Sequence, residues 1–90
     1  MKVKFFANIR DITKSKEIEM EAPEDIMRLL FLLSEKYGKE MRKKLISEDN
    51  RLHSDMIVLL NGRHIEHLEE ERSKLSDNDT VSFFPRIAGG

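Results

Sequence analysis

One amphipathic segment, flanked on both sides by patterns typical of β-strands, limits the folds open to this 90-residue chain. Between Pro23 and Gly38, large apolar residues recur at the spacing of a single helix face: Ile26, Leu29, Leu30, Leu33 and Tyr37. Pro23 suits a first helical position, and Gly38 suits the residue just beyond a helix end. The sequence therefore predicts one main helix in a single domain with one modest core.

Two alternating stretches precede this helix and predict a β-hairpin. Residues 2–8 alternate with the period of a half-buried strand, and residues 16–22 repeat the pattern. The side chains expected to face the helix are Val3, Phe5 and Ala7 in the first strand and Ile18, Met20 and Ala22 in the second. We expect residues 11–15 to connect the two strands.

Strand patterns return after the main helix. Residues 39–46 predict a shorter second helix, and the apolar run Met56–Leu60 predicts a central strand. That run ends at Asn61-Gly62, the preferred dipeptide of a type I′ turn, so a return strand should follow at residues 63–65.

A last turn and strand complete the predicted sheet. Asp77-Asn78-Asp79 marks the turn, with Asn78 suited to positive φ, and Thr80–Pro85 is the final strand. The order ββαββ or ββααβββ indicates an α+β fold, in which a mixed sheet carries one main helix packed on one face.

Charge and cysteine content exclude several function classes. Basic and acidic side chains nearly balance, with a net charge of −1, so we expect no nucleic-acid partner. The sequence has no Cys, which excludes disulfides, thiolate metal sites, a thiol nucleophile and a persulfide carried by the chain itself. We find no membrane-length apolar stretch and no signal-peptide pattern, and we therefore expect a cytoplasmic protein with no membrane partner.

No side-chain constellation argues for catalysis or metal binding. His64 and His67 lack a third ligand at fixed spacing, so we expect polar surface there. Gly38-Lys39 is not a phosphate-binding loop, because Leu33 stands where that motif has its first glycine. Two charged runs are interpreted as solvated faces: Lys39, Arg42, Lys43 and Lys44, and Glu66, Glu69, Glu70 and Glu71. We expect a non-enzyme that binds no metal or cofactor by itself.

The sequence closes on Ala88-Gly89-Gly90, a few residues after the final strand. Glycine has no Cβ and loses the most entropy on ordering, so two glycines add nothing to a core and make the chain thin. Residues 86–90 would reach roughly 15 Å when extended and could thread a narrow channel in a partner. We expect residues 1–86 to form the domain and residues 87–90 to form a flexible tail that delivers the Gly90 carboxylate.

With this strand order, the sequence resembles the MoaD/ThiS family of ubiquitin-like sulfur carriers, and within it most of all the small subunits of molybdopterin synthase. The likeness covers essentially the whole chain. It rests on residues 3–7 with Arg10-Asp11, Leu60-Asn61-Gly62, Leu75 with residues 77–79, and the Phe-Pro-x-x-x-Gly-Gly end. The family commonly has a second proline at the position of Arg86 and a glycine at that of Asn78.

The resemblance implies a β-grasp fold and a C-terminal Gly90 that a separate activating enzyme adenylates with ATP and Mg²⁺. A sulfur donor protein would convert the adenylate to a thiocarboxylate, and the large subunit of molybdopterin synthase would pass the sulfur to a pterin precursor. In this interpretation Ile87, Ala88 and Gly89 thread the partner's channel. Activation is needed because a carboxylate is a poor electrophile.

Phe6 and Phe84 are the predicted partner contacts, together with Arg86. If Phe5 and Phe83 face the helix, alternation turns Phe6 and Phe84 to the opposite face of the sheet. Their exposure alone fits scattered surface apolarity equally well. The resemblance, in which the open sheet face docks on a partner, favours a docking surface.

Other functions share this sequence pattern. A ubiquitin-like modifier would join Gly90 to a target lysine after the same adenylation. A thiamine-pathway sulfur carrier is usually shorter and lacks the Phe-Phe-Pro approach to the diglycine. A binding module with an idle tail would lose nothing when the glycines are trimmed. The sequence also leaves the molybdenum and tungsten pathways open.

Overall fold

The computed structural model describes residues 1–86. Its strands are β1 Lys2–Phe5, β2 Glu17–Glu19, β3 Met56–Leu60, β4 Arg63–His64 and β5 Thr80–Pro85. Its helices are α1 Arg10–Thr13, α2 Ile26–Tyr37 and α3 Lys39–Leu45, with 3₁₀ turns η1 Ala7–Ile9, η2 Ile65–His67 and η3 Glu70–Arg72. Apart from α1 and the 3₁₀ turns, the order is ββααβββ, one of the two orders expected from the sequence.

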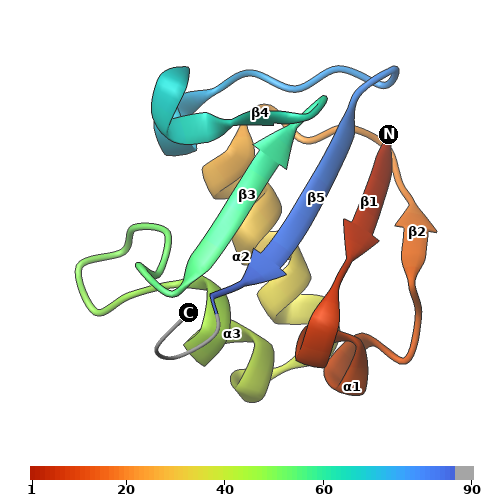
Figure 1. Ribbon diagram of the computed structural model, residues 1–90, viewed down its shortest axis with the longest axis vertical. Helices are drawn as coiled ribbons and strands as arrows, with labels where there is room; N and C mark the ends of the chain where they lie inside the picture. The colour runs from red at the N-terminus through yellow and green to blue at the C-terminus, as the bar shows by residue number, and fades with distance from the viewer. Residues whose placement is uncertain (87–90) are drawn as a thin grey trace.

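The strands form one five-stranded mixed sheet in the order β2-β1-β5-β3-β4. β1 and β5 run parallel at its centre, and the other neighbouring strands are antiparallel. Figure 1 shows α2 lying across one face of this sheet. The expected α+β, ubiquitin-like β-grasp architecture is therefore confirmed. Because Met56 pairs with Pro85, the end of β5 lies beside the residues that lead into β3.

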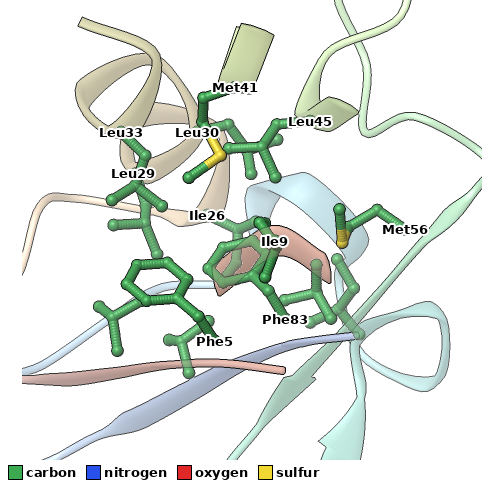
Figure 2. Packing of buried hydrophobic residues seen from close by; sticks show 14 of the residues in the cluster. Phe5, Ile9, Ile26, Leu29, Leu30, Leu33, Met41, Leu45, Met56 and Phe83 are labelled. Carbon is green, nitrogen blue, oxygen red and sulfur yellow. The ribbon is translucent and has the colours of Figure 1, made fainter. Parts of the chain in front are cut away.

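The core lies between the helices and the inner face of the sheet. Phe5 and Phe83, which are neighbours in the β1–β5 register, are fully buried and stack with ring centroids 6.2 Å apart. Figure 2 shows both rings among the apolar side chains of the helices. The other fully buried apolar side chains include Val3, Ile9, Ile26, Leu29, Leu30, Met41, Leu45, Val58 and Val81. The predicted inward phase is thus confirmed for Val3 and Phe5 in the first strand and for Val81 and Phe83 in the last.

The predicted hairpin forms, but its strands are shorter than expected and its connection is helical. β1 ends at Phe5, and Ala7 is exposed at φ +56° instead of facing α2. Ile9 fills this part of the core, because the chain turns through η1 and α1. The Arg10 Nε donates a hydrogen bond to the Phe5 carbonyl (2.8 Å), which holds this turn against the end of the strand.

The main helix begins at Ile26 and not at Pro23. The Asp25 carboxylate accepts a hydrogen bond from the backbone N–H of Arg28 (2.9 Å) and caps the helix, so Pro23 precedes it. Gly38, at φ +92°, follows the last residue of α2 as predicted. The second helix also forms as predicted and ends at Leu45.

The turn that follows β3 and the turn that precedes β5 are stabilised in different ways. Asn61 and Gly62 have φ values of +53° and +84°, as a type I′ turn requires. Asn78 does not adopt the positive φ that was expected of it. The Asp79 carboxylate holds this turn instead, accepting hydrogen bonds from the Ser76 backbone N–H and the Asn61 side-chain amide, both at 2.8 Å.

Candidate functional site

The sheet face turned away from α2 carries an apolar patch near the end of β5. Phe6 directly follows β1 and Phe84 lies in β5, and their rings stack with centroids 4.2 Å apart and planes 11° from parallel. Ile57 pairs with Phe84 across β3 and β5, and Leu59 shares its face by alternation. All four side chains are half-buried, and none belongs to the apolar set that packs on the core. We call Phe6, Ile57, Leu59 and Phe84 the open-face patch.

Arg10 borders the open-face patch, although its role was not inferred from the sequence. Its guanidinium carbon lies 5.5 Å from the centroid of the Phe6 ring, within the range of a cation–π contact. Its Nε is also bound to the Phe5 carbonyl. A signal existed, since Phe6 and Arg10 have the i, i+4 spacing of a helical turn. That signal is visible only once residues 7–13 are known to be helical.

Arg86 anchors the base of the proposed tail and does not extend the stack. Its backbone N–H donates to the Asp55 carbonyl (2.6 Å), and its Nε donates to the Ser54 carbonyl (3.0 Å). The structure therefore brings together Phe6 and Phe84 but directs Arg86 to the loop before β3. The predicted tail residues Ile87, Ala88, Gly89 and Gly90 lie outside the described residues, as does the division of the chain at residue 87.

The loop before β3, residues 47–55, is tied to η3 by a buried carboxylate. Glu71 has a relative exposure of only 9% and accepts two hydrogen bonds from the Arg51 guanidinium (both 3.1 Å). It also accepts the backbone N–H of Leu52 (2.8 Å). Glu70, which is exposed, bonds to the same guanidinium. We call Arg51 and Glu71 the clamp. The prediction that Glu71 belongs to a solvated acidic run was wrong.

Burial and hydrogen bonding have opposite effects on the pKa of Glu71 in the clamp. Burial by itself acts to raise the pKa of the Glu71 carboxyl, because it removes water from the charged form. The hydrogen bonds from Arg51 and from the Leu52 N–H, with the positive charge of Arg51, outweigh burial and hold that pKa below its usual value. The hydrogen bond and charge of Glu71 in turn raise the pKa of Arg51. Both side chains are therefore charged at neutral pH.

The histidines make local contacts. His64 Nδ1 accepts a hydrogen bond from the backbone N–H of Glu66 (3.2 Å), and the His64 and His67 rings lie edge to face, 6.1 Å apart. Within residues 1–86, no three His, Asp or Glu side chains gather in a way that would hold a metal ion. In the same part of the chain, no helix has the length and apolar content needed to cross a membrane.

The sequence matches the family model described as the ThiS family over residues 3–90. The chain belongs to the ThiS family. A curated relative, small archaeal modifier protein 3 of Haloferax volcanii, is 34% identical over 92 residues and covers 100% of this chain and 98% of its own. A protein of Archaeoglobus fulgidus named "Putative sulfur carrier protein" is 29% identical over 75 residues, covering 82% of this chain and 84% of its own.

Solved structures give the same result. Small archaeal modifier protein 1 of Methanosarcina acetivorans superimposes with a TM-score of 0.86 at 28% identity, over 99% of this chain and 94% of its own. The Pyrococcus furiosus protein named "Putative molybdopterin converting factor, subunit 1" has a TM-score of 0.75 at 26% identity, over 96% and 95% of the two chains. The protein is thus a member of a family of small ubiquitin-like sulfur carriers and modifiers.

Proposed function

We propose that this chain is a sulfur-carrier protein, the small and non-catalytic subunit of a molybdopterin or tungstopterin synthase. A separate activating enzyme uses ATP and Mg²⁺ to adenylate Gly90, a sulfur donor protein converts it to a thiocarboxylate, and the large synthase subunit passes the sulfur to a pterin precursor. The observation that carries this proposal is the Phe6–Phe84 stack near the end of β5. A partner that binds over the stack would bind the residues that follow β5 at the same time.

The chain's own residues supply binding and delivery. The open-face patch offers adjacent aromatic rings that a partner can desolvate, and aromatic anchors of this kind contribute most to interface energies. Arg86 fixes the chain just past β5 through its two hydrogen bonds to residues 54 and 55. In the activating enzyme, a Gly90 carboxylate oxygen attacks the α-phosphorus of ATP and pyrophosphate leaves. Sulfide-level sulfur (HS⁻) delivered by the donor protein then attacks the acyl carbon, the bond from that carbon to the AMP oxygen breaks, and AMP leaves with the electron pair.

The names of two similar proteins support the sulfur-carrier proposal. The Archaeoglobus protein is named as a sulfur carrier, and the Pyrococcus protein is named as a molybdopterin converting factor subunit. A second candidate function is that of a protein modifier joined through Gly90 to lysines. The observation that favours it is the 34% identity to the Haloferax modifier protein over the full length of this chain. Both functions begin with the same acyl adenylate.

Intact mass measured on the protein from cells separates the two functions. A carrier gains the mass of one sulfur-for-oxygen exchange, whereas a modifier yields lysine-linked conjugates of higher mass. If neither the sulfur-for-oxygen species nor the lysine-linked conjugates are found, both proposals are contradicted.

A second test concerns Gly90 itself. Adding one bulky residue after Gly90 displaces the carboxylate by about 3.5 Å and places a side chain in the channel, so acquisition of AMP from the activating enzyme should stop. The matched control extends the N-terminus by the same residue. Adenylation that survives the C-terminal extension overturns the assignment of Gly90.

A further inference from the structure

The loop of residues 47–55 is held at both of its ends. Toward its start, Ser47 and Arg51 exchange backbone and side-chain hydrogen bonds, and Leu52 pairs with Ile46 in an isolated β-bridge. Toward its end, the His53 carbonyl accepts the Met56 N–H (3.0 Å). These local bonds make the loop a structured segment, so a displacement at Arg51 is transmitted to the residues that precede β3.

The clamp is a side-chain contact that fixes the middle of this loop to η3. Arg51 presents its guanidinium edge to both oxygens of Glu71, a bidentate arrangement that sets orientation as well as distance. Glu71 belongs to η3 and lies 20 residues after Arg51 in the sequence. Because Glu71 is almost fully buried, its position is set by packing and not by solvent.

The far end of the loop holds the base of the tail. The carbonyls of Ser54 and Asp55 accept the two hydrogen bonds that Arg86 donates. The backbone bond of Arg86 extends the β3–β5 pairing past Pro85, which itself has no N–H to donate. The position of the chain at Arg86 therefore depends on where residues 54 and 55 lie.

We infer that Arg51 and Glu71 are positioning residues for the end of β5: they orient Arg86 through the loop 47–55 and so set the direction in which the chain leaves the sheet beside the open-face patch. The inference rests on the proposed function for its chemical consequence. A docked partner that receives Gly90 in a narrow channel needs the tail at a fixed angle to the docking face, since small misplacements of a reacting group reduce rates strongly. Neither residue touches the reacting atoms.

Three variants isolate the clamp. Glu71→Gln keeps the size of the side chain and one acceptor oxygen for the Leu52 N–H, but it turns an amide N–H₂ toward the Arg51 guanidinium. Glu70→Gln is the matched control, because Glu70 bonds to the same guanidinium from an exposed position. Arg51→Lys keeps the charge and loses the bidentate fork, which provides a second variant should Glu71→Gln not fold.

The first measurement is amide hydrogen exchange in the isolated protein, which needs no partner. We expect the Arg86 N–H to exchange about tenfold faster in Glu71→Gln and in Arg51→Lys than in the wild type or in Glu70→Gln. The Asn61 N–H, which donates to the Thr80 carbonyl (2.8 Å) at the other end of β5, serves as the internal reference and should not change. Equal exchange at Arg86 in all four proteins overturns the inference.

The second measurement is the rate at which the activating enzyme places AMP on the chain. The clamp variants should lower kcat about tenfold with KM unchanged, because the docking patch is intact and only the fixed orientation of Arg86 is lost. Faster exchange at Arg86 with a wild-type kcat also overturns the positioning role. A wild-type chain that acquires no AMP at all refutes the proposed function instead, and the exchange data still decide whether the clamp controls Arg86.

Discussion

The molecule has an inner pair of phenylalanines, Phe5 and Phe83, and an outer pair, Phe6 and Phe84. Each member of the outer pair directly follows a member of the inner pair in sequence, and the two pairs lie on opposite faces of the sheet. Phe5 and Phe83 are 0% exposed and form the floor of the core, with centroids 6.2 Å apart. Phe6 and Phe84 are half-buried on the sheet face turned away from α2, and they stack closer, at 4.2 Å. The residue type is the same, and strand alternation alone assigns one pair to stability and leaves the other available to a partner.

The largest expected effect is on the inner pair. Phe5→Ala or Phe83→Ala should lower the free energy of unfolding by roughly 3–5 kcal/mol. Each substitution removes a fully buried ring and leaves a cavity that the packed helices cannot fill. Urea denaturation measures this loss, with Phe6→Ala and Phe84→Ala as the matched controls. If the outer substitutions prove the more damaging, the division between the two faces is wrong.

The outer pair should control binding instead. Replacing Phe6 and Phe84 together by Ser should weaken the complex with the proposed partner, the large synthase subunit, by about 2–4 kcal/mol, as expected for aromatic anchors at the centre of an interface. The isolated double variant should remain folded by circular dichroism. Calorimetric titration that returns an unchanged affinity would move the docking surface to another part of the molecule.

The inner and outer faces could be predicted because period-two alternation is local. Val3, Phe5, Val81 and Phe83 are all buried as their spacing indicated. The same rule failed at Ala7, where a turn with positive φ ended the strand early and brought Ile9 into the core. Alternation states which face a residue takes only while the strand lasts, and nothing local marked the end of β1. The start of α2 was placed too early for a different reason: Pro23 was taken as a first helical residue, whereas Asp25 caps the helix.

The candidate site was predictable only in part. Phe6 and Phe84 came together as expected, because each directly follows a member of the inner pair, Phe6 just past the end of β1 and Phe84 in the neighbouring parallel strand β5. The clamp was not found, because Arg51 and Glu71 are 20 residues apart and meet only through tertiary structure. A carboxylate within an acidic run gives no sign in sequence that it is the buried one. The contacts of Arg86 with residues 54 and 55 depend in the same way on the pairing of β3 with β5.

The clamp allows the stability of the fold to be changed without touching either aromatic pair. Glu71→Ala should cost about 1–3 kcal/mol, because it leaves the Leu52 N–H and the Arg51 guanidinium without their buried acceptor. The lowered pKa of Glu71 makes this contribution depend on pH. It is fully present above the unfolded-state value of about 4.3 and is lost as pH falls through the lower folded-state value.

The pH dependence is measured as the change in unfolding free energy between neutral and acidic solution. The wild type should lose more stability below about pH 4.3 than Glu71→Gln, which has no carboxyl to protonate at this position. Glu70→Gln, at an exposed position, should follow the wild type. Parallel pH curves for all three proteins would show that Glu71 contributes no proton linkage.

The smallest expected effect tests whether Arg10 belongs to the outer pair. Arg10→Leu keeps an apolar stem beside Phe6 but removes the cation over the ring and the hydrogen bond to the Phe5 carbonyl, so it should cost about 1 kcal/mol of stability. A double-mutant cycle separates the two terms. In a Phe6→Ala background the cation has no ring to cover, so the cost of Arg10→Leu should shrink by about 0.5–1 kcal/mol. In a Phe83→Ala background the ring contact is intact, and the two losses should add. Equal coupling of Arg10 to Phe6 and to Phe83 would mean that the inner and outer faces are not energetically separate at this end of the sheet.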